Sequence, residues 1–560
     1  MNKKKTERIF KEVHSVKEYL EVLKGHGAKT AYRWLSGKEY LSISYEDFHA
    51  KIIAIAKGFK KAGLGGKCIA VVGESSVEWV ASYLAILASG GVVVPMDKEL
   101  DIEAIGGFLE TANAEAIVYS KSFNTKLAPI EESHATVKKL IAMDKDAPVS
   151  EKVTTLEGII EGGKDEELEV TDRSVEELAV MLFTSGTTGT SKCVMLCEKN
   201  IWSTVNSACA TVEFFKEDTI VSVLPLHHTY ELACMLSGLN YGMEIGINDS
   251  LRNLMKNFAE FKPTGLVLVP LFVNTMYKRI MDKAEKSGQL KKLKFGIKLS
   301  NFLRHLGIDI RHKLFKDVIN AFGGRLNKIV SGGAPLNPEM MKQFDALGIT
   351  IAEGYGITEC SPLISVNPYY ALKSGSVGPA VPSCTVRIDG DVKGEHGFVE
   401  GEIQVKGDNV MLGYKNEAEN AKAFTEDGWY RTGDVGYMDK DGYIYITGRL
   451  KSVIVLENGK NVFPEEIEEY LEKIDDVGEV VVVGRKAEDG ETVKLTAIVY
   501  PAAEKWGETP NAEEVHKVLY AKIVDLNKKL PSFKQIRDLE IRTEPFEKTT
   551  SRKIKRHLVK

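Results

Sequence analysis

The sequence lacks any uninterrupted apolar run long enough to cross a bilayer. Its longest apolar stretch, residues 79–95, is broken by serine and by two glycines, whereas a membrane-spanning helix needs about 20 consecutive apolar residues. The N-terminal sequence MNKKKTERIF carries charges with no apolar run after them, so we expect neither export nor insertion into a membrane. Peripheral contact with a membrane is compatible with these features.

The sequence also lacks a basic excess. It has 74 Lys and Arg residues against 79 Asp and Glu residues, which gives a formal net charge of −5. A dedicated nucleic-acid binder is marked by a surplus of positive charge. We therefore expect no nucleic-acid partner.

Cysteine is scarce, with seven residues that are scattered along the chain and odd in number. This usage fits a reducing compartment, so we predict a cytoplasmic protein. Cys193 and Cys197 have a spacing seen in metal-binding pairs, but no second Cys or His pair lies nearby at ligand spacing. We expect them to be buried free thiols.

What is present is a repeated alternation of apolar strands with helical patterns. CIAVVG (68–73) reads as a buried strand, Ser75 and Glu78 form a capping-box pattern before a helix, and AIVYS (116–120) reads as a later strand. The same strand pattern returns at 264–270, 327–333 and 349–356. Strands that alternate with helices predict an α/β fold with a mostly parallel sheet.

The pattern of predicted strands and helices changes twice towards the C-terminus. From about residue 385, short strands with Gly and Asp turns indicate a β-rich antiparallel piece. After residue 450 a strand, the helix PEEIEEYLEKI and two further strands form a compact α/β unit. We predict an N-terminal domain, 1–449, with a β-rich subdomain at about 385–449, and a C-terminal domain, 450–560.

Residues 276–322 form a lysine-rich and strongly helical insertion. Its charges fit a solvated helix face, and binding to a membrane surface is the alternative interpretation.

One segment, TSGTTGTSK (184–192), follows an apolar strand and is rich in Thr, Ser and Gly. A Walker A loop needs four residues between its Gly and its Gly-Lys pair, whereas Gly186 and Gly189 are separated by two. Phosphate binding nevertheless suits this composition. Glycine permits close backbone approach, hydroxyls and N–H groups donate to oxyanions, and Lys192 adds a cation.

TSGTTGTSK resembles the phosphate loop of the acyl-adenylate-forming enzymes, the superfamily of acyl-CoA synthetases, luciferases and peptide-synthetase adenylation domains. The family's other signatures follow in its order: LPLHHTYE (224–231), SGGAPL (331–336), GYGITE (354–359), WYRTGD (429–434), GRLKSVIVLENGKNVFPEEIE (448–468) and SRKIKR (551–556). Glu231 and the helical insertion make the chain most similar to the long-chain fatty acid–CoA ligases.

The resemblance implies a large N-terminal domain of αβαβα sheets with the β-rich subdomain, and a small, mobile C-terminal α/β domain. It implies an enzyme that uses ATP and Mg²⁺ to activate a carboxylic acid as acyl-AMP and then transfers the acyl group to CoA. It assigns the nucleotide to Thr184, Ser185, Gly186, Thr187, Thr188, Gly189, Lys192, Gly332, Gly333, Ala334, Gly354, Tyr355, Gly356, Thr358, Asp434, Arg449 and Lys553.

The same resemblance assigns the catalytic roles and the metal. Catalysis falls to His228, Thr358, Glu359 and Lys553, and Mg²⁺ to Glu359 assisted by the Thr184 hydroxyl. His227 is the rival of His228. Arg552 stands where the family has Gly before its lysine, so Lys555 is the rival of Lys553. Lys451 sits at the family's hinge, about which the small domain rotates between the two half-reactions.

The acyl chain needs an apolar slot, for which 264–276 and 360–366 are the candidate segments. The implied substrate is a medium-to-long-chain fatty acid. The alternative functions are a freestanding enzyme that loads a separate acyl carrier protein, and a non-catalytic nucleotide sensor. A homodimer is known among relatives and is a further expectation.

Overall fold

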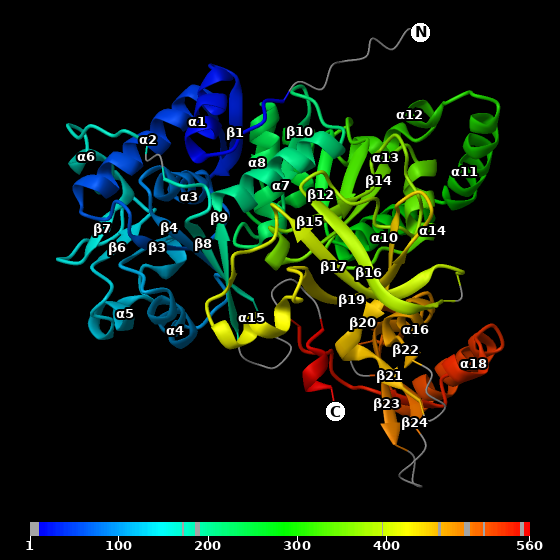
Figure 1. Cartoon of the computed structure of the whole chain (residues 1–560). Coiled ribbons are helices and arrows are strands. Elements are labelled where there is room, and N and C mark those ends of the chain that lie inside the picture. The colour runs from blue at the N-terminus through cyan, green and yellow to red at the C-terminus, as the bar shows by residue number, and fades with distance from the viewer. Residues whose placement is uncertain are drawn as a thin grey trace. The chain divides into compact units, whose positions relative to one another are not determined.

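The structure, a computed structural model, describes residues 10–170, 173–184, 191–394, 396–456, 461–486, 493–507, 510–548 and 554–559. The chain forms two compact units. The first comprises most of the chain up to Val386 together with Val405–Tyr430, and the second comprises Arg387–Gln404 together with residues from Arg431 on. Figure 1 shows the elements of both units, which are described separately below.

The first sheet belongs to the first unit and has eight strands in the order β18-β9-β8-β4-β3-β5-β6-β7. Its strands are β3 (Cys68–Val72), β4 (Val92–Met96), β5 (Ala116–Tyr119), β6 (Lys139–Ala142), β7 (Val153–Thr155), β8 (Leu178–Thr184), β9 (Lys192–Cys197) and β18 (Gly413–Tyr414). The strands from β8 to β7 in this order are parallel to their neighbours, whereas β9 is antiparallel to both β8 and β18. The predicted strands and their parallel arrangement are confirmed.

The N-terminal cap of the helix after β3 differs from the prediction. Helix α3 (Val77–Ala88) is capped by Ser76, whose side chain accepts a hydrogen bond from the backbone N–H of Trp79. The predicted cap was Ser75, one residue earlier. Ser76 is the residue with extended backbone angles, which bring its hydroxyl to the open N–H groups of the first turn. Every residue of α3 except Glu78 is buried, as expected for a helix covered on all sides.

The second sheet also belongs to the first unit and has the order β15-β14-β13-β12-β10-β11-β1-β2. Its strands are β1 (Thr30–Ser36), β2 (Glu39–Ser44), β10 (Thr219–Ser222), β11 (Glu244–Ile247), β12 (Gly265–Leu268), β13 (Lys328–Ser331), β14 (Thr350–Gly356) and β15 (Leu363–Val366). β12, β13 and β14 are parallel neighbours, so their carboxyl ends meet at one edge of the sheet. This edge is where parallel α/β sheets bind ligands.

Helices surround these two sheets. They are α1 (Val16–Gly25), α2 (Tyr45–Lys61), α4 (Ile102–Ala112), α5 (Ala128–Ser133), α6 (Leu156–Gly162), α7 (Glu198–Thr211), α8 (Thr229–Tyr241), α9 (Leu254–Phe261), α10 (Pro270–Lys286), α11 (Leu290–His305), α12 (Arg311–Leu314), α13 (Lys316–Ala321), α14 (Pro338–Ala346) and α15 (Glu417–Ala423). The second sheet packs against α9, α10, α13 and α14 through a core that includes Phe258, Phe261 and Phe344. Figure 1 shows α10, α13 and α14 in green.

The second unit contains most of the β-rich segment and the C-terminal part of the chain. A four-stranded sheet has the order β16-β17-β19-β20, made of β16 (Cys384–Lys393), β17 (Val399–Gly407), β19 (Tyr430–Met438) and β20 (Ile444–Arg449). A smaller sheet joins β23 (Val477–Lys486), β24 (Val493–Pro501) and β25 (Asp538–Ile541). The other elements of the second unit are β21 (Ile454–Val455), β22 (Asn461–Val462), α16 (Pro464–Leu471), α17 (Ala503–Trp506) and α18 (Ala512–Asn527).

The helices of the second unit cover the smaller sheet through an apolar core. Ile467 and Leu471 of α16 and Leu519 of α18 pack against Val482 and Val499 of the sheet. The mixed α/β class, with a large N-terminal part of several sheets and a smaller C-terminal part, is therefore confirmed.

Two general features bear on the sequence-based predictions. Across the part of the chain that the structure describes, no helix combines the length and the apolar character needed to span a membrane. All seven cysteines are free thiols. Cys193 and Cys197 are both buried, and burial raises the pKa of the Cys193 thiol to about 11.

Candidate active site

The two ends of the predicted phosphate loop lie side by side in the first sheet. β8 ends at Thr184, β9 begins at Lys192, and these two residues pair across the antiparallel ladder. The Thr184 hydroxyl donates a hydrogen bond to the Lys192 carbonyl at 3.5 Å. The predicted loop residues Ser185, Gly186, Thr187, Thr188 and Gly189 lie outside the described residues.

Lys192 lies against a short segment from much later in the chain. Its ammonium group is 4.6 Å from the centroid of the Tyr414 ring and forms an ion pair with Glu419 of α15. A cation over an aromatic face is attracted by the negative charge of that face. Lys192 is thus held at the start of β9 by one aromatic ring and one carboxylate.

The same tyrosine reaches Glu359, the predicted metal ligand. Glu359 lies in a 3₁₀ turn, η2 (Thr358–Cys360), directly after β14. The Tyr414 hydroxyl donates a hydrogen bond to Glu359 Oε1 at 2.7 Å and lies 3.2 Å from the Tyr430 hydroxyl. Burial, followed by the Glu359 carboxylate, raises the pKa of Tyr414, so its phenol stays protonated and can donate.

Backbone contacts hold Tyr414 between the two predicted site segments. The amide of Met411 donates to the Glu359 carbonyl, and the amide of Leu412 donates to the Met195 carbonyl, both at 2.9 Å. The amide of Lys415 donates to the Cys193 carbonyl at 2.9 Å. Residues 411–415 therefore join β9, where Lys192 lies, to the turn that carries Glu359.

These residues fit a magnesium ion that is shared with a substrate. Mg²⁺ prefers oxygen ligands and is usually held by one or two carboxylates together with phosphate oxygens and water. Glu359 is partly exposed and offers such a carboxylate. Among the described residues, no group of three or more His, Cys, Asp or Glu side chains could hold a metal by itself.

The glycine segments predicted to face the adenylate come together at the carboxyl ends of β13 and β14. The Gly332 amide donates to the Leu268 carbonyl at 3.2 Å, and Gly333 has φ +83°. A Cβ atom on Gly332 would lie 3.2 Å from Tyr230 Cζ and 3.3 Å from the Gly354 carbonyl oxygen, so a larger residue would force these neighbours to shift by a few tenths of an ångström. Ala334, the next predicted residue, is exposed.

A buried acid that sequence reasoning missed fixes this loop. Glu353 of β14 is 4% exposed, and its Oε1 accepts a hydrogen bond from the Leu336 amide at 2.9 Å. The loop after β13 is thereby tied to β14. An acid within an apolar strand pattern is the signal that could have identified it, because a buried charge needs a partner.

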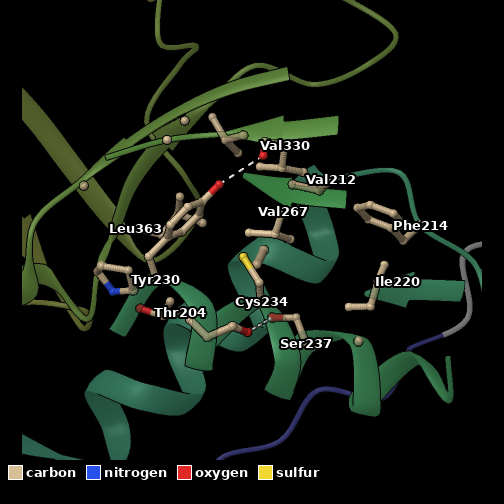
Figure 2. Close-up of a pocket in the computed structure, with 18 of the residues that line it drawn as sticks. Thr204, Val212, Phe214, Ile220, Tyr230, Cys234, Ser237, Val267, Val330 and Leu363 are labelled. Atoms are coloured by element: carbon tan, nitrogen blue, oxygen red, sulfur yellow. Dashed lines mark hydrogen bonds between the residues drawn. The ribbon is translucent and has the colours of Figure 1, made fainter. Parts of the chain in front are cut away.

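An apolar cavity of about 110 Å³ lies beside the two glycine segments. Figure 2 shows α7 and α8 on one side of it and the strands of the second sheet on the other. The cavity is lined by Thr204, Ala208, Val212, Phe214, Ile220, Tyr230, Ala233, Cys234, Ser237, Gly238, Tyr241, Met243, Val267, Val330, Gly332, Gly333, Gly354, Tyr355, Gly356, Pro362, Leu363 and Val366.

Both segments predicted for the acyl chain contribute to this cavity. Val267 comes from 264–276, and Pro362, Leu363 and Val366 come from 360–366. The contribution of α7 and α8 was not predicted, because Thr204, Cys234 and Ser237 lie in ordinary helical patterns. Tyr355, predicted to stack on adenine, is 8% exposed and lines the cavity.

Tyr230 of α8 occupies the side of the cavity next to Gly332. Its hydroxyl donates to the Val330 carbonyl at 3.1 Å, as Figure 2 shows, and lies 3.3 Å from the Leu268 carbonyl. The ring is thereby attached to the ends of β12 and β13.

The two candidate histidines precede α8 and have different surroundings. Their rings lie 4.1 Å apart, and His227 Nε2 is 3.4 Å from Asp97 Oδ2. His228 is the N-cap residue of α8. Three residues later, Glu231 is 3% exposed, and burial raises its pKa to about 8.

In the second unit, Asp434 and Arg449 form a pair. They are opposite each other in the antiparallel ladder of β19 and β20, and Arg449 Nε lies 2.8 Å from Asp434 Oδ1. The Asp434 side chain is almost fully buried, whereas half of the Arg449 side chain is exposed. Two residues predicted to bind the nucleotide are therefore neighbours.

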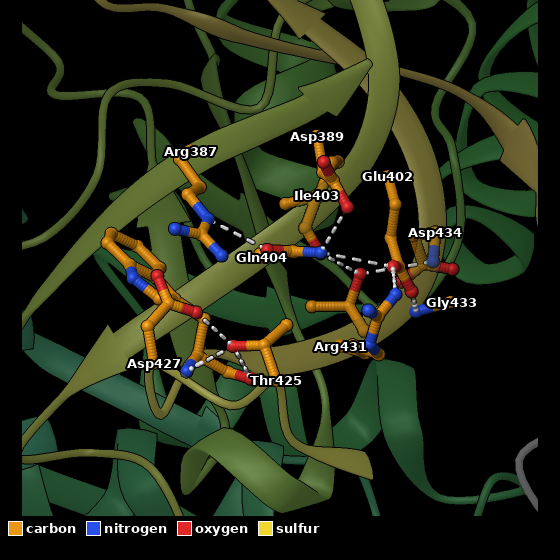
Figure 3. Close-up of polar contacts among 12 residues, drawn as sticks. Arg387, Asp389, Glu402, Ile403, Gln404, Thr425, Asp427, Arg431, Gly433 and Asp434 are labelled. Carbon is orange, nitrogen blue, oxygen red and sulfur yellow. Dashed lines mark hydrogen bonds and ion pairs between the residues drawn. The ribbon is translucent and has the colours of Figure 1, made fainter. Parts of the chain in front are cut away.

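A polar cluster that sequence reasoning missed supports the turn before Asp434. Glu402 accepts hydrogen bonds from the Gly433 amide at 3.2 Å and from Arg431 Nη1 at 3.0 Å. Figure 3 shows that Gln404 connects Glu402 to Arg387 and Asp389. Glu402 and Gln404 are both buried and are two residues apart in β17. This spacing is ordinary for one face of a strand, so nothing in the sequence indicated that they support the turn before Asp434.

The two candidates for the C-terminal lysine differ in what the structure describes. Lys553 lies outside the described residues. Lys555 is described, and its Nζ is 3.8 Å from Glu547 Oε2. Residues 554–559 are anchored, because Arg556 forms an ion pair with Glu468 of α16.

Known proteins match the chain over most of its length. The family model for AMP-binding enzymes matches residues 20–415, and the model for the AMP-binding enzyme C-terminal domain matches residues 451–560. A long-chain-fatty-acid–CoA ligase of Mycobacterium bovis is 30% identical over 78% of this chain and 74% of its own length. Long-chain-fatty-acid–CoA ligase 1 of Homo sapiens is 30% identical over 92% of this chain and 78% of its own length.

Solved structures share the fold. ATP-bound MatB from Rhodopseudomonas palustris has a TM-score of 0.74 and 23% identity, and the match covers 96% of this chain and 98% of that protein. The adenylation domain of a carboxylate reductase from Mycobacterium chelonae has a TM-score of 0.80 and 21% identity, with coverages of 97% and 89%. On the two family matches and the 30% identical relatives, the chain belongs to the AMP-binding enzyme family.

Proposed function

We propose that the chain is an ATP-dependent acid–thiol ligase that activates a fatty acid as acyl-AMP and transfers the acyl group to CoA, releasing AMP and pyrophosphate. The observation that carries the proposal is the apolar cavity beside Gly332–Gly333 and Gly354–Gly356. An acyl chain in this cavity would present its carboxylate to a nucleotide held at the carboxyl ends of β13 and β14.

In the first half-reaction a carboxylate oxygen attacks the α-phosphorus of ATP, and the bond from that phosphorus to pyrophosphate breaks. Two anions must approach each other, so cations and donors on the phosphates lower the barrier. Lys192 and Lys553 supply positive charge, and the hydroxyls and amides of Thr184–Gly189 donate to the phosphates. When bound, Mg²⁺ neutralises phosphate charge, and Glu359 and Thr184 are its proposed ligands.

In the second half-reaction the thiol sulfur of CoA attacks the carbonyl carbon, the carbon–oxygen bond breaks so that AMP leaves, and the thiol proton passes to solvent. We propose that His228 lies on the path of the thiol. The support is that His228 is the N-cap residue of α8, two residues before Tyr230, which lines the cavity. Lys553 remains the proposed lysine of the first step, with Lys555 as its rival.

Asp434 is the proposed ribose ligand, and Arg449 is proposed to reach the same nucleotide. A carboxylate can accept hydrogen bonds from two ribose hydroxyls, and the Arg449 contact orients it. We propose domains at 1–449 and 450–560, with Lys451 at the hinge in the 3₁₀ turn η3 (Leu450–Ser452). The family-model matches that end at 415 and begin at 451 support this boundary.

The proposed acid is of medium to long chain. The support is the apolar lining of the cavity together with relatives whose names state long-chain fatty acid–CoA ligation. The same names favour CoA over a separate carrier protein as acceptor. A cytoplasmic location, supported by the seven free thiols, and a homodimer remain predictions.

The test supplies ATP, Mg²⁺ and a series of saturated acids of increasing chain length, with CoA or a holo acyl carrier protein as acceptor. We expect AMP and acyl-CoA in equal amounts, with fatty acids preferred over short polar acids. Acylation of the carrier protein alone would reassign the acceptor, and ADP instead of AMP as the product would overturn the proposal.

A further inference from the structure

Helix α11 is attached to the first unit by one of its faces. Gly296 and Ser300 are buried, and Leu293 and Ile297 pack against the core of the second sheet. A Cβ atom on Gly296 would lie 3.3 Å from Phe315, which shows how closely the helix approaches its neighbours. One turn beyond Ser300, Arg304 forms an ion pair with Asp345 of α14.

The opposite face of α11 carries large apolar side chains that point to solvent. Phe295 is 68% exposed, Phe302 is 62% exposed and Leu306, which caps the helix, is 61% exposed. Spacings of seven and four residues place these three side chains in one line along the helix. They are called the α11 stripe below.

Further exposed apolar residues lie close to the stripe in sequence. Ile308, just after the helix, is 49% exposed, whereas Leu314 of α12 is 41% exposed and packs beside Gly296 on the other face. Single exposed apolar residues are normal, whereas a group of them marks a surface that binds something. In Figure 1, α11 and α12 lie at the outer edge of the first unit.

Positive charge accompanies the stripe. α11 contains Lys291, Lys292, Lys294 and Lys298 and has no acidic residue, although the whole chain has a net charge of −5. Lys291 is one turn before Phe295, and Lys298 lies between Phe295 and Phe302 on the same side of the helix. Arg304, the other cation of the helix, is on the packed face.

We propose that the α11 stripe and its lysines dock the protein on an anionic lipid bilayer. A helix that lies in the plane of the interface has this arrangement, with an apolar line immersed among the acyl chains and cations at the headgroups. Each lysine near an anionic surface adds attraction that is screened by salt.

A second copy of the chain fits the same surface less well. A symmetric contact of two stripes would bring the lysines of both copies together, and like charges would repel each other. Bilayer docking also goes beyond the proposed ligase activity, because it requires neither ATP nor an acid. It would place the enzyme where sparingly soluble apolar acids collect.

The test measures binding of the full chain, without substrates, to vesicles of phosphatidylcholine alone or with about 30% phosphatidylglycerol. We expect binding to the anionic vesicles that falls when salt is raised. Replacing two stripe residues, Phe295→Ser with Phe302→Ser, should lower the partition coefficient at least about tenfold. The matched control, Val149→Ser with Leu41→Ser, changes two exposed apolar residues elsewhere and should bind as the parent does.

A second pair of variants tests the charge. Lys291→Gln, Lys292→Gln and Lys298→Gln together should remove the preference for anionic over neutral vesicles. The control with the same change in net charge, Lys61→Gln, Lys164→Gln and Lys216→Gln, alters well-exposed lysines elsewhere and should keep that preference.

Three results would overturn the proposal. The first is a parent protein that stays unbound to anionic vesicles. The second is binding that is equal in the stripe variant and the parent. The third is a concentration-dependent dimer in sedimentation velocity that the stripe variant abolishes, since this would assign the stripe to a second copy. A failure of bilayer docking would not contradict the proposed ligase activity, which the ligase assay tests separately.

Discussion

At the scale of single residues, Tyr414 connects two side chains that are far apart in the sequence. Its ring lies under the Lys192 ammonium, and its hydroxyl donates to Glu359. Both partners are proposed to meet the triphosphate and its metal. The phenol can therefore set the direction of the Glu359 carboxylate, while the ring limits where Lys192 can go.

Removing only the hydroxyl of Tyr414 separates these two effects. Tyr414→Phe keeps the ring under Lys192 and loses the hydrogen bond to Glu359. We expect the concentration of Mg²⁺ for half-maximal activity to rise about tenfold, because a hydrogen bond to a charged group contributes about 1.5 kcal/mol. Binding of Mn²⁺ with ATP, followed by electron paramagnetic resonance, should weaken in parallel.

Tyr430→Phe is the matched control, because it removes a neighbouring phenol and leaves the bond from Tyr414 to Glu359 in place. We expect a smaller change in metal dependence for this variant. Equal effects of the two substitutions would contradict a positioning role for Tyr414.

Glu231 gives the protein a pH-dependent stability. Burial raises its pKa from 4.5 to about 8. Between these values the folded protein holds a proton that the unfolded chain has released, so the free energy of unfolding falls as pH rises. The slope from this group is at most about 1.4 kcal/mol per pH unit, and it vanishes above the folded-state pKa.

Glu231→Gln keeps the shape of the side chain and removes the titration. We expect urea unfolding at about pH 5.5 and about pH 7.5 to show a smaller difference in the variant than in the parent. Identical slopes for the two proteins would mean that Glu231 is ionised in the folded state.

At the scale of elements, α8 combines two duties. Its N-terminal turn follows the histidines, and its next turns face the cavity through Tyr230, Cys234 and Ser237. Changes of side-chain volume on this helix should therefore alter which acids bind. Changes at Cys234 and Ser237 should do so with the least effect on the nucleotide residues, because Tyr230 is the α8 residue that lies against Gly332.

Cys234 is the position where this can be tested in both directions. Cys234→Phe fills part of the cavity, and we expect the KM for the longest accepted acid to rise at least about tenfold, since a lost methylene contact costs about 0.8 kcal/mol and several would be lost. Cys234→Ala enlarges the cavity and should shift the preference towards longer acids. Chain-length profiles that stay unchanged in both variants would place the acyl chain elsewhere.

In the second unit, α16 holds the end of the chain. Glu468 is 7% exposed, accepts a hydrogen bond from the Val482 amide and forms an ion pair with Arg556. Burial raises the pKa of Glu468 to about 7, and Arg556 opposes this shift. The segment that carries the candidate lysines is therefore attached to the second unit just beyond residue 553.

Arg556→Gln should leave a buried carboxylate without its cation. We expect the second unit to lose about 2 kcal/mol of stability, less than for a fully buried pair because Arg556 is one-third exposed. The double variant Arg556→Gln with Glu468→Gln should recover part of this loss in thermal unfolding. A double variant less stable than either single variant would contradict the stranded-charge argument.

At the scale of the whole molecule, continuous apolar runs made the central strands predictable. β3, β12 and β13 are buried on both faces, so their sequences read as short apolar blocks between turns. Helix α16 of the C-terminal part was predictable from its 3.6-residue period and its initial proline.

Contacts between distant segments were not predictable. β18 has two residues and pairs with β9 more than two hundred residues earlier, so neither strand pattern signals the pairing. The contact of Tyr414 with Glu359 depends on that pairing. The cap at Ser76 was missed for a local reason, since two consecutive serines offer the same hydroxyl and only the backbone angles distinguish them.

The residues of the candidate site also fall into two groups, those that were predictable from local sequence and those that were not. Motifs predicted the glycine segments, Lys192, Glu359, Asp434 and Arg449, because each motif is a short continuous stretch of sequence. Glu402, Gln404 and Glu353, which fix those segments, were missed because each is a single polar residue within a strand.

The most direct measurement of the central claim is exchange of labelled pyrophosphate into ATP in the presence of a fatty acid and Mg²⁺, with CoA left out. The account predicts exchange that requires the acid and falls at least about a hundredfold in Glu359→Gln and Lys553→Gln. Pyrophosphate that fails to enter ATP with every acid supplied, while the protein is folded and binds ATP, would contradict formation of an acyl-adenylate.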